Sequence, residues 1–218
     1  MTSKHTLAQF TVSGYVRQHQ KETKGFQQYN HKLFQNIPPL VTSIVFGYYF
    51  MNGYFEIAGY GVGISENGWS IAICHGDWNN STYSVPILST LKRICTWKFK
   101  IHGGSGLMIG ISSSIQTDQQ FIKGSKGVRY GYCGWNGNKL DSDHEWSDSY
   151  GDSYTKGDTL TVQLDLINGK ITFYKNGKSQ GVAYENIQQD VNTEYRLAIS
   201  MGDRNSNIEM TNYDERFQ

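Results

Sequence analysis

The sequence predicts an all-β protein, either a sandwich or a barrel, and three observations support this. Aromatic residues make up 14% of the chain, a proportion that favours strands. The 24 glycines against 3 prolines suit tight turns between strands. From residue 53 onward the apolar pattern has a period of two, and strand candidates recur at intervals of about 8 to 12 residues, as in sandwiches.

Two segments precede the strands. Residues 1–36 are polar, with five Lys or Arg residues against one Glu, and we expect a basic extension. Residues 37–52 predict a short amphipathic helix, because two prolines suit its first turn and apolar residues follow at helical spacing. These apolar residues are Leu40, Val41, Ile44, Val45 and Tyr48. The favoured interpretation is that they pack on the following domain, residues 53–218.

The alternating pattern places nine strands in that domain. We predict them at residues 54–64, 69–75, 94–102, 107–112, 128–133, 159–167, 170–175, 195–201 and 207–211.

Residues 157–178 give the most detailed prediction, a three-strand meander. Asn168-Gly169 and Asn176-Gly177 each suit a two-residue hairpin turn, which needs positive φ at both residues. The first turn would pair Ile167 with Lys170 and place one apolar face toward the core. The predicted core residues are Leu160, Val162, Leu164, Leu166, Ile171 and Phe173.

The charge balance gives no reason to expect a nucleic-acid or membrane partner, since 20 Lys and Arg face 19 Asp and Glu. No stretch approaches the length of a membrane span, and the N-terminus lacks the apolar segment of a signal peptide. We therefore expect a cytoplasmic protein. Cys74, Cys95 and Cys133 are widely spaced without a C-x-x-C pair, so buried free thiols are the prediction.

Local motifs for catalysis or cofactor binding are absent from the sequence. Gly177-Lys178-Ser179 lacks the earlier glycine of a phosphate-binding loop and is predicted to be a turn. The acidic run between Asp141 and Asp152 has Trp146 where a calcium loop needs glycine, which favours a solvated loop. We predict no cofactor, no metal and no enzymatic activity. A carboxylate pair assembled in space is the enzymatic alternative.

The run Gly157-Asp158 through Ile187, with its two Asn-Gly turns, resembles the SPRY domain family nearly residue for residue. Residues 97–101, 108–112, 130–135, 197–200 and 208–210 are similar to further strands of that family. The resemblance implies a bent two-sheet antiparallel β-sandwich of jelly-roll type, which here would follow a short N-terminal helix.

What the resemblance implies about function is non-enzymatic recognition of a peptide or protein through loops at one rim of the sandwich. By similarity to the SPRY-and-SOCS-box adaptors, three stretches correspond to that rim. They are residues 75–80, the neighbourhood of Phe121, and residues 202–205. The candidate partner-binding residues are His75, Asp77, Trp78, Asn79, Phe121, Asp203, Arg204 and Asn205.

The first of these loops has Gly76 and Trp78 where the adaptors have arginine and proline, and Asp203 replaces a tryptophan. Only the location of the site therefore carries over. We expect Trp78 and Phe121 to anchor a partner, an aromatic role common in interface hot spots. Burial of Trp78 in the core is an equal alternative.

Two other functions are kept as alternatives. One is the substrate-recognition part of a ubiquitin-ligase assembly, because Ile37-Pro38-Pro39-Leu40 resembles the start of an F-box helix. The other is a lectin-like glycan binder, which rests on analogy between sandwich folds.

Overall fold

The computed structural model describes residues 55–59, 62–65, 70–73, 80–84, 86–90, 92–104, 106–115, 120–123, 126–142, 149–190, 193–204 and 206–217. All of them belong to one compact unit, Asn52–Gln218. The predictions of a basic extension at residues 1–36 and of a helix at 37–52 lie outside the described residues.

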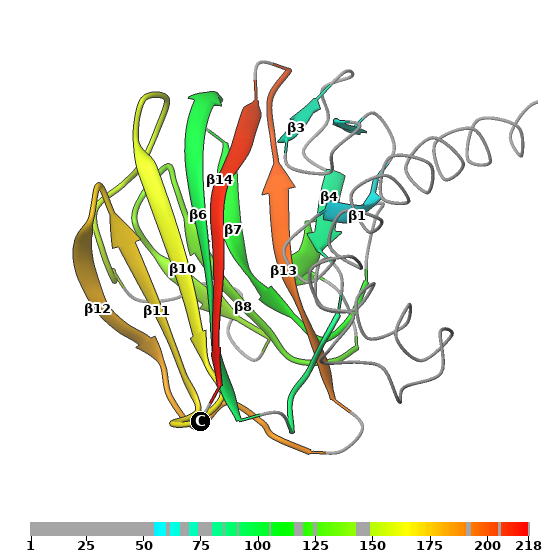
Figure 1. The fold of residues 1–218 in the computed structure, drawn as a ribbon. Helices are drawn as coiled ribbons and strands as arrows, with labels where there is room; N and C mark the ends of the chain where they lie inside the picture. Colours follow the sequence, from blue (N-terminus) through cyan, green and yellow to red (C-terminus); the bar gives the residue numbers. More distant parts are fainter. Residues whose placement is uncertain are drawn as a thin grey trace, which may run out of the picture. The chain divides into compact units, whose positions relative to one another are not determined.

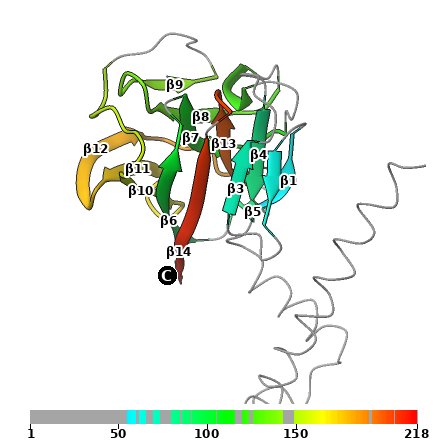
Figure 2. The same cartoon turned by 90° about the horizontal axis from the view of Figure 1, so that it is seen from above.

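The described chain forms two antiparallel seven-stranded sheets packed face to face, which confirms the predicted two-sheet sandwich (Figures 1 and 2). Sheet A contains, in spatial order, β1 (Phe55–Ala58), β4 (Asn80–Ser84), β13 (Glu194–Met201), β7 (Leu107–Ser112), β8 (Arg129–Cys133) and β9 (Lys139–Asp141), with β5 (Ile87–Leu88) paired to β13. Sheet B contains β12 (Lys178–Tyr184), β11 (Lys170–Lys175), β10 (Thr159–Asp165), β6 (Arg93–Gly103), β14 (Asn207–Phe217), β3 (Ser70–Ile73) and β2 (Val62–Ile64).

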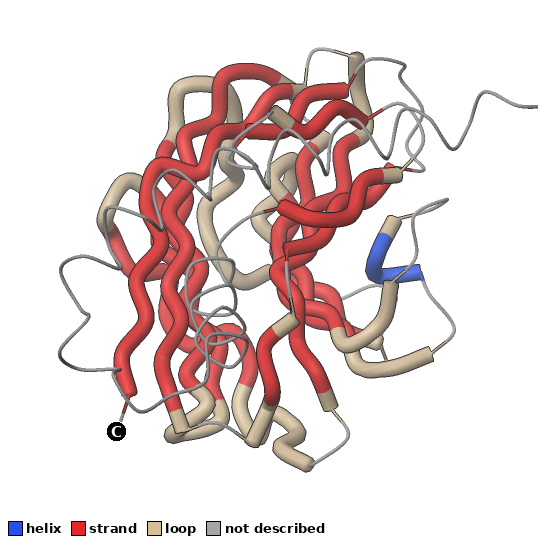
Figure 3. Tube along the Cα trace, turned by 45° about the vertical axis from the view of Figure 1, so that its right-hand side comes forward, coloured by secondary structure: helices blue, strands red, loops and turns tan. Residues whose placement is uncertain are grey.

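Helical structure is almost missing from the part of the chain that the structure describes. It consists of the single 3₁₀ turn η1 (Phe121–Lys123), drawn in blue in Figure 3.

The main core lies between the two sheets, and in sheet B it is built by strict alternation along the central strands β6 and β10. In β6, buried and more exposed residues alternate from Arg93 to Gly103, as expected of a strand with one face on the core. All six core residues predicted from the meander have 0% exposed area, which confirms that prediction: Leu160, Val162, Leu164, Leu166, Ile171 and Phe173.

A second, smaller apolar cluster covers the outer face of sheet A. It consists of Tyr83, Met108, Phe121, Ile122, Cys133, Leu140 and Ala198. Strand β7 is therefore buried on both faces, and all six of its residues are buried. Alternation in sequence could not reveal this, because a strand covered on both sides needs no polar face.

The two Asn-Gly turns differ. Asn176 and Gly177 have φ values of 50° and 81°, and Lys175 pairs with Lys178, so this two-residue turn is confirmed. At Asn168-Gly169 the predicted register is wrong, because Asp165 rather than Ile167 pairs with Lys170. The Asp165 carboxylate accepts hydrogen bonds from the backbone N–H groups of residues 167 and 168, which stabilises a four-residue turn. The register moves by two residues, so the core face is unchanged.

The predicted single strand at 54–64 is also wrong, because it divides into β1 of sheet A and β2 of sheet B. The chain crosses between the sheets near Gly59, whose N–H donates to the Ser81 carbonyl. Strands β4, β5 and β9 were not predicted. Strand β14 continues to Phe217, beyond the predicted end at Thr211. The prediction stopped too early because a bulge between Met210 and Asn212 shifts the alternation by one residue.

Candidate functional site

One end of the sandwich is called here the upper rim, and it carries the described part of the predicted loop at residues 202–205. Strands β3, β6, β8 and β13 end there, and β4, β7 and β14 begin there, as the pairings show. The described residues of the upper rim are Gly104, Gly106, Gly134–Gly137, Gly202–Arg204 and Ser206. Figure 1 shows the connection from β13 to β14 at the top of the molecule.

Main-chain hydrogen bonds hold these loops together. The Gly202 N–H donates to the Gly106 carbonyl at 2.9 Å, and the Gly134 N–H donates to the Leu107 carbonyl at 2.8 Å. Gly104 has a φ of +93° and lies against Ser206, where a side chain would clash with the Ser206 backbone. The upper rim is thus a set of loops tied to the ends of sheet A.

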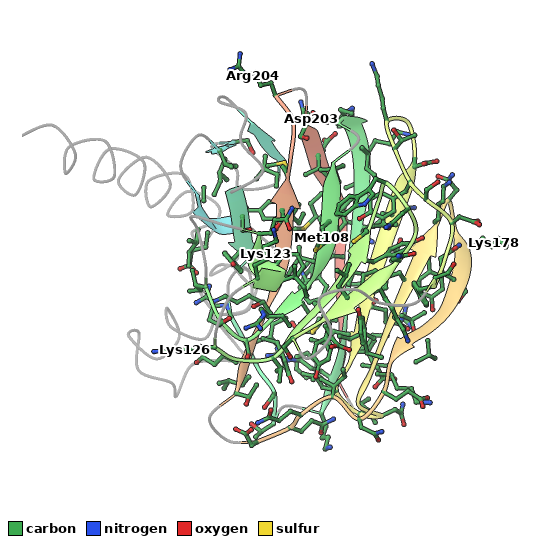
Figure 4. The ribbon with its side chains drawn as sticks, turned by 180° about the vertical axis from the view of Figure 1, so that it is seen from behind. Met108, Lys123, Lys126, Lys178, Asp203 and Arg204 are labelled. Atoms are coloured by element: carbon green, nitrogen blue, oxygen red, sulfur yellow. The ribbon has the colours of Figure 1, made fainter. Side chains whose placement is uncertain are left out.

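The side chain of Asp203 stabilises the loop that carries it. One carboxylate oxygen accepts a hydrogen bond from the Gly106 N–H at 3.4 Å, and the other accepts one from the Ser206 hydroxyl at 3.1 Å. The next residue, Arg204, is exposed, and Figure 4 shows its side chain pointing away from the end of the sandwich. The structure therefore assigns Asp203 a supporting role in the loop and leaves Arg204 at the surface.

Five of the predicted site residues lie outside the described part of the chain: His75, Asp77, Trp78, Asn79 and Asn205. Residues 75–79 lie between strands β3 and β4, both of which are described. Asn207 pairs with Ala72 of β3, near that strand's end, and Asn80, which opens β4, pairs with Met201 at the end of β13. Strand β3 therefore ends, and β4 begins, at the upper rim.

Phe121 requires a correction. Its ring has 0% exposed area and packs on the outer face of sheet A, so in this structure it is a core residue and not a surface anchor. Its N–H donates to the Ser200 hydroxyl at 3.0 Å. Gly131 makes room for the ring, since a Cβ there would lie 3.3 Å from its Cζ atom.

Trp135, which was not among the predicted site residues, is a large exposed aromatic side chain at the upper rim. It lies in the turn between β8 and β9 and is 45% exposed. The resemblance places it in residues 130–135, which are similar to a strand of the family, although the alternating pattern ends the predicted strand at residue 133. The neighbouring Asn136-Gly137 was the signal for a turn, and Gly137 does have a φ of +74°.

A buried tyrosine braces the turn that carries Trp135. The Tyr154 N–H donates to the Gly134 carbonyl at 2.8 Å, and its hydroxyl donates to the Tyr132 carbonyl at 2.6 Å. Burial raises the pKa of Tyr154 well above its ordinary value, so the hydroxyl keeps its proton and remains a donor. Tyr154 therefore holds the backbone on the N-terminal side of Trp135 in place.

The titratable groups of the described residues show no sign of an activated nucleophile. Burial raises the pKa of both the Cys95 and the Cys133 thiol to about 12, which keeps them protonated at neutral pH. Asp158 has a lowered pKa: partial burial opposes ionisation, but hydrogen bonds from Thr155 and Asn176 and the charge of Lys175 outweigh it. A general acid would need the opposite shift.

The described residues contain neither a cluster of metal ligands nor a membrane-spanning helix. In these ranges, no three His, Cys, Asp or Glu side chains come close enough together to hold a metal ion. Nor does any helix there have the length and apolar character that crossing a membrane requires.

Comparison with solved structures supports the fold. The SPRY domain of human HERC1 aligns with a TM-score of 0.57 at 19% identity, over 72% of this chain and 96% of that one. A second human SPRY domain aligns with a TM-score of 0.55 at 12% identity, over 71% and 96%. The TRIM65 PSpry domain aligns with a TM-score of 0.51 at 14% identity, over 85% and 98%.

The family model of the SPRY domain matches residues 94–215, which is more than half of the chain. The matched range runs from β6 to β14 and includes the 157–187 stretch on which the sequence resemblance rests. The chain belongs to the SPRY domain family.

Proposed function

We propose that this chain is a non-enzymatic protein-interaction module that binds a peptide or protein surface through the loops of its upper rim. Membership of the SPRY family supports a protein partner, since domains of this family are generally interaction modules. The near-neutral charge of +1 gives no field that would attract nucleic acid.

The observation that carries the proposal is the construction of the loop after β13. Asp203 and the Gly202 N–H tie this loop to Gly106, while Arg204 stands exposed at its tip. A loop tied to a rigid scaffold holds its backbone in place before a partner arrives, which lowers the entropic cost of binding. Arginine is also enriched among residues that dominate binding energy.

The test compares proteins captured from native lysate by three forms of the full chain. These are the wild type, the rim variant Trp78→Ala/Arg204→Ala, and the control variant Arg216→Ala/Phe217→Ala. The control removes the same kinds of side chain from the C-terminal end of β14, where the Phe217 side chain is 55% exposed. All three forms should melt at similar temperatures, so that lost binding does not reflect lost folding.

Mass spectrometry then identifies the proteins that each form captures. We expect at least one partner to be missing from the rim variant and present with both other forms. If the rim variant retains every partner of the wild type, recognition does not use the upper rim and the proposal fails.

A further inference from the structure

Two residues of the upper rim with exposed side chains lie in connections that leave the strands on either side of β7. Trp135 lies in the turn after β8, and Arg204 lies in the loop after β13. Tryptophan and arginine are the side chains found most often where binding energy concentrates, since they offer a large apolar surface and a fork of donors. The two residues come from connections about 70 positions apart in the chain.

The sheet sets the distance between the strand ends from which the two connections leave. Strands β13, β7 and β8 are neighbours in this order, with Met201 opposite Leu107 and Cys133 opposite Met108. Two strand spacings separate the ends of β13 and β8, which corresponds to about 10 Å. Because both connections are bonded to the start of β7, the sheet sets this distance.

The charges around Arg204 favour an acidic partner. Both carboxylate oxygens of the adjacent Asp203 accept hydrogen bonds from their own loop, from the Gly106 N–H and the Ser206 hydroxyl. Arg204 itself forms no ion pair with any residue of the described ranges. Its guanidinium fork is therefore available for a carboxylate, the group it matches best in shape and charge.

We propose that the partner of this module presents a carboxylate to Arg204 and an apolar side chain to Trp135, the two lying about 10 Å apart. This rests on the proposed function and specifies the ligand of the same rim. In an extended polyproline II segment, three residues advance about 9 Å and bring a side chain back to the same face. The segment that fits is thus an acidic residue and an apolar residue with two residues between them.

The test uses fluorescein-labelled dodecapeptides of proline, alanine and glutamine that carry one glutamate and one leucine. Zero to five residues separate the two, in both orders, and fluorescence anisotropy with the full chain gives the dissociation constants. We expect binding to be tightest with two residues between them. Arg204→Glu should weaken binding of that peptide about tenfold, and so should Trp135→Ala, which corresponds to about 1.4 kcal/mol.

Charge reversal supplies the internal controls. A lysine in place of the peptide's glutamate should restore binding to the Arg204→Glu variant and weaken binding to the wild type. The matched surface variant Arg216→Glu, on β14 outside the rim, should bind as the wild type does. Three results would overturn this inference: equal affinity at every spacing, unchanged affinity after either rim substitution, or no binding up to millimolar concentrations.

The two proposals fail in different ways. If the lysate partner depends on the upper rim but no peptide shows the expected spacing, the rim is the binding site and only the chemistry of its ligand is wrong. If the rim variant captures the same lysate partners as the wild type, the proposed function itself fails.

Discussion

Replacing Tyr154 by Phe tests the internal support of the upper rim. The substitution removes one hydroxyl and keeps the ring, whose exposed area is 2%. The hydroxyl donates to the Tyr132 carbonyl at 2.6 Å, inside the sandwich where water does not replace it. Losing a buried hydrogen bond and leaving its acceptor without that donor should cost about 1 to 3 kcal/mol. For a chain of this length, that lowers the melting temperature by about 2 to 12 °C.

Tyr174→Phe is the matched control. Its hydroxyl donates to the Gln163 side-chain oxygen at 3.4 Å on the half-buried outer face of sheet B, where water can take its place. We expect the control to stay within about 0.5 kcal/mol of the wild type.

Urea unfolding followed by circular dichroism measures both variants, and equal m-values would show that the comparison is sound. A Tyr154→Phe variant as stable as Tyr174→Phe would refute the argument that the buried hydroxyl supports the Trp135 turn.

Three further predictions concern stability. Gly177→Ala should lower the free energy of unfolding in urea by about 1 kcal/mol, because φ is +81°, where a Cβ atom is strained. No atom lies within 4 Å of the added methyl group, so a clash contributes nothing, and an unchanged urea midpoint would contradict the prediction. Glu215→Gln should lower the free energy of unfolding by about 3 to 5 kcal/mol, because it leaves the buried Arg93 charge unpaired. In the same urea experiment, the double variant Arg93→Met/Glu215→Leu should be more stable than Glu215→Gln. Burial raises the pKa of the Cys95 and Cys133 thiols from 9.0 to about 12, so the folded form keeps protons that the unfolded form releases. Stability should therefore be full below pH 9 and fall as the pH rises toward 12, by about 1.4 kcal/mol per thiol between pH 8 and 10. The Cys95→Ala/Cys133→Ala variant should lack this part of the slope in unfolding experiments at the two pH values.

The sequence alone predicted the features that depend on near neighbours in the chain. The alternation from Leu160 to Leu166 identified a core face, because successive side chains of a strand point to opposite sides whatever lies around it. Asn176-Gly177 identified its turn, because few residues other than these adopt positive φ at low cost. The same stretch carried the resemblance to the SPRY family, which the match over residues 94–215 confirms.

Local signals failed where a side chain competed with the turn or where the partner strand was distant. The Asp165 carboxylate lengthened the turn at Asn168-Gly169, although the dipeptide is the same as at the other turn. The short strand β9 has too few residues to show a period, and its pairing to β8 defines it. The roles as ubiquitin-ligase component or glycan binder stay predictions, since no contact described for this chain bears on them.

The candidate site shows most clearly what only the tertiary structure decided. Sequence placed Asp203 and Arg204 between two predicted strands, and the structure has them between β13 and β14. The resemblance placed Phe121 at the binding surface and Trp135 in a stretch similar to a strand, and the structure has the first in the core and the second, exposed, in a turn. The physical reason is that exposure of an aromatic side chain depends on what packs against it. For Phe121 that is Gly131 and Ser200, which meet it only when strands distant in the chain come together in sheet A.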